Sequence, residues 1–182
     1  MDKILNDKAT CSAFVIKKII ETYQNTCGEI AKELYNKVSK IDISNPFAQI
    51  PLSFLDELIE WVEKELGPAN VKMIGHILGE TAFETLKKEK QLPEKATPKE
   101  IIEKLMLVLQ SIIQDPFRRN LKVVEVQNNF ARVRRTQAFH PTVQIGIIES
   151  FIRKAGVSLP RTRLIRDYEN GPEYDEYEIT WY

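Results

Sequence analysis

Apolar side chains recur every three to four residues through the first two-thirds of the chain, a spacing that predicts amphipathic helices. We expect a first helix from Ser12, interrupted at Gly28, and further helices that begin near Ser53 and Asn70. The side chains of Ser53 and Asn70 are the predicted caps of those two helices. Segment 44–51 contains two prolines and is predicted to be a loop.

The helix predicted over 98–114 has the clearest start signal in the chain. Thr97 and Glu100 have the spacing of a capping box, and Pro98 occupies the favoured first helical position. Its interior is the most apolar of the predicted helices. We therefore expect this helix at the centre of the fold.

The pattern changes after Pro116, where β-branched residues on both sides of Asn128 and Asn129 predict a β-hairpin. A helix is expected after Pro141. A second hairpin is predicted at the end of the chain, because its last strand alternates apolar and polar residues.

This order of elements predicts an α+β fold in which an N-terminal helical region packs on an antiparallel sheet of about four strands. Residues 1–115 are mainly helical, and residues 116–182 form a hairpin–helix–hairpin unit. A length of 182 residues with 43% hydrophobic content suits a single domain over 1–182.

The charges balance, with 26 basic and 26 acidic side chains. A formal net charge of zero argues against a general polyanion binder, so we expect no nucleic-acid partner. All apolar runs are too short to span a bilayer. The charged N-terminus lacks the apolar core of a signal peptide, which predicts a cytoplasmic protein.

The balance conceals a basic cluster in the first hairpin. Six basic residues and one acidic residue lie between positions 118 and 135. The basic residues are Arg118, Arg119, Lys122, Arg132, Arg134 and Arg135. We interpret this cluster either as the solvated outer face of a hairpin or as a docking surface for an acidic partner. The second hairpin is expected to neutralise itself, since its arginines face an acidic strand.

Candidate chemistry is sparse. The chain contains none of the familiar catalytic or phosphate-binding motifs, which predicts a protein that is not an enzyme and has no catalytic residues. Its only histidines are His76 and His140, too few for a multi-histidine metal site. Cys11 and Cys27 are predicted to be free thiols. His140, at a strand-to-helix junction, is the better candidate for contacting a ligand.

Several segments resemble a known superfamily: FVIKKIIETYQNTCGEI, IGHILGETAFETL, HPTVQIGIIESFIRKAGV and EYEITWY, with Gly75, Gly79, Gly146 and Gly156 as markers. The superfamily comprises the haem-binding H-NOX sensor domains, the 4-vinyl-reductase-type small-molecule-binding domains and the TRAPP vesicle-tethering subunits. The chain most resembles stand-alone bacterial members, such as the paralogues of myxobacteria.

The resemblance implies a haem site that this sequence does not match. H-NOX domains carry the haem-ligating histidine on the central helix, and segment 98–114 contains none. The Tyr-x-Ser-x-Arg motif that holds the haem propionates would fall in RVRRTQAF, which lacks both the tyrosine and the spacing. The cysteines that end many 4-vinyl-reductase-type domains are also missing. We therefore expect no haem, no metal and no other cofactor.

Two functions follow from the resemblance. The first is a non-enzymatic sensor domain in bacterial signalling that binds a hydrophobic small molecule or acyl chain in a pocket between helices and sheet. The candidate pocket residues are Phe83, Met106, Leu109, Phe139, His140 and Phe151, and for each apolar side chain ordinary core packing is the alternative. The second is an adaptor or homodimeric scaffold without ligand, similar to the tethering subunits, that docks through the basic hairpin or an exposed helix face.

Overall fold

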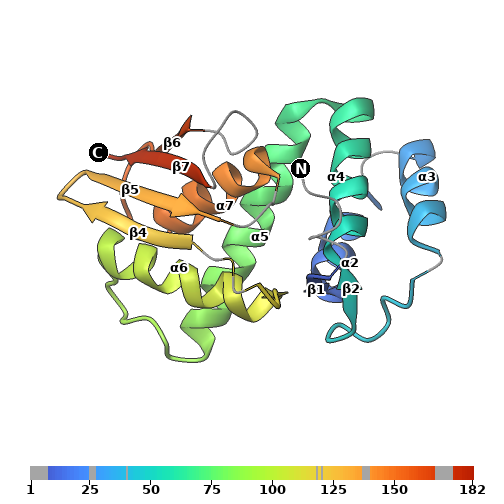
Figure 1. Ribbon diagram of the computed structural model, residues 1–182, viewed down its shortest axis with the longest axis horizontal. Helices are drawn as coiled ribbons and strands as arrows, with labels where there is room; N and C mark the ends of the chain where they lie inside the picture. Colours follow the sequence, from blue (N-terminus) through green and yellow to red (C-terminus); the bar gives the residue numbers. More distant parts are fainter. Residues whose placement is uncertain are drawn as a thin grey trace.

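The computed structural model describes residues 8–24, 28–39, 41–117, 119, 121–136, 140–166 and 174–182. In chain order its elements are β1 (Thr10–Ser12), α2 (Ala13–Gln24), α3 (Gly28–Val38), β2 (Gln49–Pro51), α4 (Leu52–Leu66), α5 (Pro68–Lys88), α6 (Pro98–Ile112), β3 (Ile113–Gln114), β4 (Leu121–Val126), β5 (Phe130–Arg135), α7 (Pro141–Arg153), β6 (Arg161–Arg166) and β7 (Asp175–Thr180). These helices and two antiparallel sheets confirm the predicted α+β class. Helices α2 to α4 lie at one end of the molecule and the larger sheet at the other (Figure 1).

The larger sheet has the strand order β4-β5-β7-β6, so the two predicted hairpins join through the antiparallel pair β5 and β7. The middle of its inner face is apolar, with Ala131, Val133, Tyr177 and Ile179 fully buried. Helix α7 packs against β6 and helix α6 against β4 (Figure 1). The alternation read from the sequence therefore gives the correct buried face for β7, with Tyr177 and Ile179 pointing inward.

A second sheet, with the order β2-β1-β3, was not predicted. In its centre Cys11 pairs with Ile50 on one side and Ile113 on the other. Each strand has only two or three residues, too few to show a period of two. The predicted loop 44–51 consequently ends in a strand, and Ser12 ends a strand instead of beginning a helix.

The two predicted caps at Ser53 and Asn70 are wrong. Helix α4 begins at Leu52, and α5 begins at Pro68 directly after Gly67, whose φ of 83° ends α4. The amide of Asn70 instead donates to the carbonyl of Leu66 at 2.7 Å from within the helix. The capping box at Thr97 and Glu100 is present in full, because its signal was reciprocal and local.

The centre of the fold is the pair α5 and α7, not α6 as predicted. These two helices make the most extensive contact in the molecule, and α5 runs between its two halves (Figure 1). Helix α6 buries one face, but Leu107 on its other side is 49% exposed. Apolar content misled the prediction, because it does not show which helices approach each other closely, as α5 and α7 do at Gly75 and Gly146.

Glycines bring the backbones of α5 and α7 into direct contact. A Cβ added to Gly75 would overlap the carbonyl of Val143 and lie 2.9 Å from the Cα of Gly146. A Cβ on Gly146 would overlap the carbonyl of Lys72 in return. One on Gly79 would lie 2.6 Å from the carbonyl of Ile147. Only residues without a side chain fit at these positions.

Candidate functional site

Three of the predicted pocket residues, Phe83, Leu109 and Phe151, lie in the packed core. The rings of Phe83 and Phe151 meet edge to face, with centroids 5.7 Å apart, and Phe151 is fully buried. Leu109 is 5% exposed. Phe139 and the side chain of Met106 lie outside the described residues. Phe83 and Phe151 thus fill space between α5 and α7 with each other's rings.

His140 precedes α7 and reaches back to the N-terminal half of the molecule. Its Nε2 lies 3.3 Å from the carboxylate of Glu63 on α4, and the side chain is 13% exposed. The backbone carbonyl of His140 accepts a hydrogen bond from the N–H of Gln144. The structure therefore brings His140 together with an acidic residue of α4.

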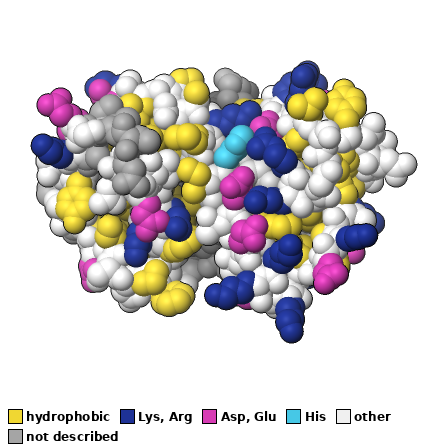
Figure 2. All heavy atoms as spheres, turned by 180° about the vertical axis from the view of Figure 1, so that it is seen from behind, with side chains coloured by type: hydrophobic (Ala, Val, Ile, Leu, Met, Phe, Trp, Pro, Cys, Tyr) yellow, Lys and Arg dark blue, Asp and Glu magenta, His cyan; other side chains and the backbone are white. Residues whose placement is uncertain are grey.

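A buried carboxylate, missed by the sequence analysis, links three elements. Glu149 of α7 accepts the Nζ of Lys72 at 2.8 Å and lies 3.5 Å from the Nε2 of His76, both on α5. Its other oxygen accepts the N–H of Thr162 on β6 at 3.0 Å. Burial raises the pKa of Glu149, but the contacts with His76, Lys72 and Thr162 outweigh it and lower the pKa below its usual value. Figure 2 shows a histidine among acidic and basic side chains on the back face.

The two histidines of this chain do not fit a histidine-ligated haem. Both histidines lie outside α6, the helix on which the resemblance implies the ligand, and each contacts a glutamate. The thiol of Cys11 is buried, and burial together with Asp56 raises its pKa to about 12, so it stays protonated. Among the described residues no group of three or more His, Cys, Asp or Glu side chains could hold a metal ion.

The basic cluster is divided by the fold. Arg135 is 1% exposed and binds Asp175 at 3.1 Å and Gln144 at 3.2 Å on the inner face of the sheet. Arg119 is largely buried and pairs with Asp115 at 2.6 Å. These two arginines therefore do not belong to an exposed docking surface, which corrects the predicted set. Arg118 lies outside the described residues.

Lys122, Arg132 and Arg134 do lie on the outer face of the sheet, but two of them have acidic partners. Arg134 donates to Glu176 at 2.6 Å, and Arg132 lies 3.5 Å from the same carboxylate. The acidic residues of β7 thus neutralise part of the positive charge of the first hairpin. They were expected to pair only with the arginines of the second hairpin. The sequence could not show that β7 lies between β5 and β6.

Within the described part of the chain, a hollow lies between α3 and α4. Helix α3 packs mainly against α2 and is held there by a narrow stripe that includes Leu34 and Val38, both fully buried. An open groove of about 470 Å³ remains on the α4 side of α3. It is lined by Asn36, Lys37, Phe54, Glu57 and Leu58.

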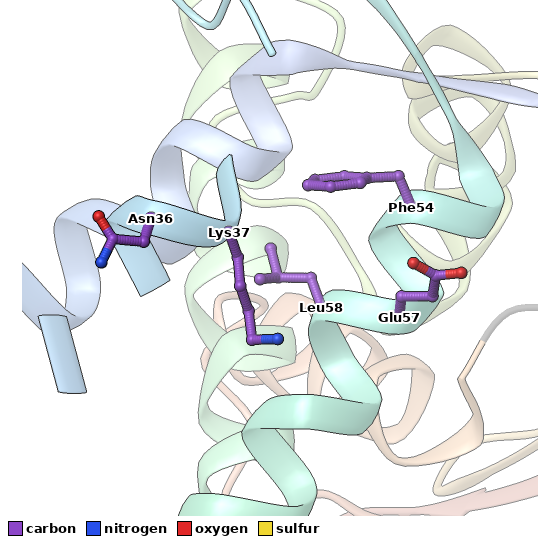
Figure 3. A pocket seen from close by; sticks show the side chains of 5 residues that line it. All are labelled: Asn36, Lys37, Phe54, Glu57 and Leu58. Atoms are coloured by element: carbon purple, nitrogen blue, oxygen red, sulfur yellow. The ribbon is translucent and has the colours of Figure 1, made fainter. Parts of the chain in front are cut away.

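The groove has an apolar floor and a charged rim. Lys37 extends from α3 toward Leu58 of α4, and the ring of Phe54 lies beside them (Figure 3). Leu58 is buried, whereas Lys37 and Glu57 are exposed. The ammonium of Lys37 lies 5.5 Å from the ring centroid of Trp61, which extends the apolar surface. Such a hollow can accept a molecule that is apolar on one side and charged on the other.

The groove was not predicted, although the sequence contains one signal of it. An apolar stripe with a single residue per turn is too narrow to cover two neighbouring helices. Because the stripe of α3 faces α2, Phe54 and Trp61 of α4 stay only half-buried.

The described helices include none that is long and apolar enough to cross a membrane. No protein-family model matches the chain. No curated protein matches it either.

Solved structures do match. An H-NOX protein from S. oneidensis in the Fe(II)NO ligation state has a TM-score of 0.72 at 12% identity, over 94% of this chain and 99% of that one. A mutant of an S. oneidensis H-NOX protein in the Fe(II) state has a TM-score of 0.75 at 12% identity, over 94% and 96%. The Fe(II) unliganded H-NOX protein from K. algicida has a TM-score of 0.66 at 8% identity, over 94% and 96%. At such low identity the likeness establishes the fold alone, and this chain has the H-NOX fold.

Proposed function

We propose that this protein is a haem-free sensor domain of bacterial signalling that binds a small amphiphilic molecule in the groove between α3 and α4. The observation that carries the proposal is the groove itself, whose volume of about 470 Å³ lies within the range of small-molecule sites. The H-NOX fold supports a sensing role. The proposal adds a charged group to the predicted hydrophobic ligand and moves the site away from the packed Phe83 and Phe151.

The lining residues favour a particular ligand chemistry. Phe54 and Leu58 offer apolar surface to an aromatic ring or acyl chain, while the ammonium of Lys37 at the rim suits an anionic headgroup. A ligand of about 20 non-hydrogen atoms at ~0.3 kcal/mol per atom would bind with a Kd of tens of micromolar. An affinity in that range suits reversible sensing.

The haem-free part of the proposal rests on the positions of the histidines. Neither His76 nor His140 lies on α6, and both contact glutamates elsewhere. The purified protein, incubated with haemin and passed over a desalting column, is expected to retain no Soret absorption band. A stoichiometric Soret band after desalting would contradict this part of the proposal without bearing on the groove.

The groove is tested by titrating the protein with anilinonaphthalene sulfonate, an anionic aromatic probe whose fluorescence rises in apolar surroundings. We expect saturable binding that Lys37→Gln weakens about three- to tenfold through the lost charge pair. Lys32→Gln is the matched control, because Lys32 is an exposed lysine of the same helix outside the groove lining. Equal binding by the two variants would refute the groove as the site.

Native mass spectrometry of the purified protein distinguishes this proposal from a ligand-free scaffold. A sensor domain is expected to carry a small co-purifying molecule in part of the population, and Phe54→Ala should reduce that fraction. A clean apoprotein that also fails to bind the probe would favour the scaffold.

A further inference from the structure

Outward-facing side chains of the larger sheet form rows that run across its strands. In one of them Lys122 of β4 lies opposite Arg134 of β5, which lies opposite Glu176 of β7, which lies opposite Arg166 of β6. We call these four residues the basic row. It contains three cations and one anion.

The adjacent row has a different composition. It contains Glu125, Arg132, Glu178 and Arg163 on the same four strands, in that order. Its charges alternate in sign, and Arg163 contacts Glu178 at 3.0 Å. We call it the neutral row. Its pairs are those that stabilise an antiparallel sheet.

The basic row breaks this rule at one position. Lys122 and Arg134 are cations placed directly opposite each other on an exposed face, an arrangement that destabilises a sheet. The neutral row, one step away on the same strands, shows that an acidic residue fits there, since Glu125 lies opposite Arg132. The pair therefore concentrates positive charge on this exposed face.

The arginines of the basic row are held in place before any partner arrives. The guanidinium groups of Arg134 and Arg166 lie over the ring of Tyr174, at 4.7 Å and 5.4 Å from its centroid. Arg134 also donates its Nε to Glu176, and Arg166 donates to the hydroxyl of Tyr174. Arg134 nevertheless stays 44% exposed. Such side chains lose little conformational entropy when an anion binds.

From these contacts we propose that the outer face of the larger sheet, centred on the basic row, is a docking surface for an acidic segment of a partner protein. Neighbouring strands lie ~4.8 Å apart, so Lys122, Arg134 and Arg166 are spaced at one and then two strand intervals. An extended segment with glutamate or aspartate side chains can place carboxylates at such intervals. Each arginine can bind one carboxylate through a bidentate pair of hydrogen bonds.

The interleaved acids favour a peptide over a nucleic acid. Glu125, Glu176 and Glu178 share the face with the cations and would repel a continuous row of phosphates. The carboxylates of a peptide are separate from one another and can lie away from these three glutamates. The proposal concerns a surface apart from the groove, and either can hold without the other.

The test is fluorescence anisotropy with a labelled synthetic peptide of alternating glutamate and serine, using the full chain. Lys122→Glu is expected to weaken peptide binding at least about fivefold and, because it now pairs with Arg134, to raise the unfolding midpoint by about 1–3 °C. Lys32→Glu, the same charge change on α3, should leave binding within about twofold because screening weakens distant charges.

The proposal predicts that Lys122→Glu weakens peptide binding and raises the unfolding midpoint. Unchanged peptide binding in Lys122→Glu, or a lowered unfolding midpoint, would overturn it. Arg163→Gln in the neutral row should weaken binding less than Arg134→Gln in the basic row, and the reverse order would overturn the assignment of the row. If a single-stranded oligonucleotide binds more strongly than the peptide, the acidic protein segment is the wrong partner and a nucleic acid takes its place.

Discussion

Helices α5 and α7 and helices α3 and α4 are two pairs in the same chain with opposite packing. The first pair meets backbone to backbone at Gly75 and Gly146. The second pair leaves a groove of about 470 Å³. Small residues at regular spacing close one contact, and a narrow apolar stripe leaves the other open. The chain is therefore tightly packed where its two halves join, and the groove lies at the end formed by α2 to α4 (Figure 1).

The largest expected effect is at the closed contact. Gly75→Ala adds a Cβ that overlaps the backbone of α7, so we expect the free energy of unfolding to fall by about 2–4 kcal/mol despite the better helix propensity of alanine. Gly28→Ala is the control, because nothing lies within 4 Å of a Cβ at that position. Urea denaturation measures both. Equal stabilities would show that α5 and α7 are not in backbone contact.

The second-largest effect is expected at α3, beside the groove. Leu34 is fully buried and helps to hold α3 against α2, so Leu34→Ala should lower the free energy of unfolding by about 2–3 kcal/mol. The same variant should lose probe binding, since α3 supplies one wall of the groove. Normal probe affinity in a destabilised Leu34→Ala protein would argue that the probe binds elsewhere.

A third effect concerns the carboxylate beside the closed contact. Glu149→Gln should lower the free energy of unfolding at neutral pH by about 1.5–3 kcal/mol, the usual worth of hydrogen bonds to a charged group. The pKa of Glu149 is lowered by folding, so its stabilisation is complete above the unfolded pKa and is lost as the pH falls through the folded value.

The stability difference between wild type and Glu149→Gln should therefore narrow in acid, below pH ~4. Chemical denaturation across pH 3 to 7 measures it. A difference that grows toward low pH would contradict the assignment of Glu149 as an ionised link between α5, α7 and β6.

The smallest expected effect is a change of affinity without a change of fold. Phe54→Leu keeps an apolar side chain at the groove and removes the aromatic ring, so probe affinity should fall about two- to threefold. The free energy of unfolding should change by less than about 1.5 kcal/mol. Fluorescence titration and urea denaturation of the same samples measure both quantities. A large loss of stability would place Phe54 in the core instead of at a ligand surface.

The sequence predicted the elements that carry long, regular patterns. The helices from Thr97 and Pro141, the first hairpin and the two strands of the second hairpin are where periodicity and turn residues placed them, while the predicted turn at Asn170 and Gly171 lies outside the described residues. Short strands and the centre of the fold could not be read that way. The four-residue spacing of Gly75 and Gly79 was a visible signal of close helix contact, and it was used only as a mark of resemblance.

The candidate sites were harder to predict, because they depend on which elements become neighbours. Alternation along β5 could have shown that Arg135 shares the inner face with Val133, and the spacing of Asp115 and Arg119 suits a local ion pair. The groove had no direct signal. The groove exists because α3 packs on α2, and the local sequence pattern does not show which helices become neighbours.

Hydrogen exchange of the backbone amides, with and without anilinonaphthalene sulfonate, tests the central claim most directly. We expect the probe to slow exchange in α3 and around Phe54 and Leu58 of α4, and to leave the closed contact of α5 and α7 unchanged. Protection confined to α6 and the larger sheet, with none in α3 or α4, would contradict the account and return the ligand to the pocket first expected between helices and sheet.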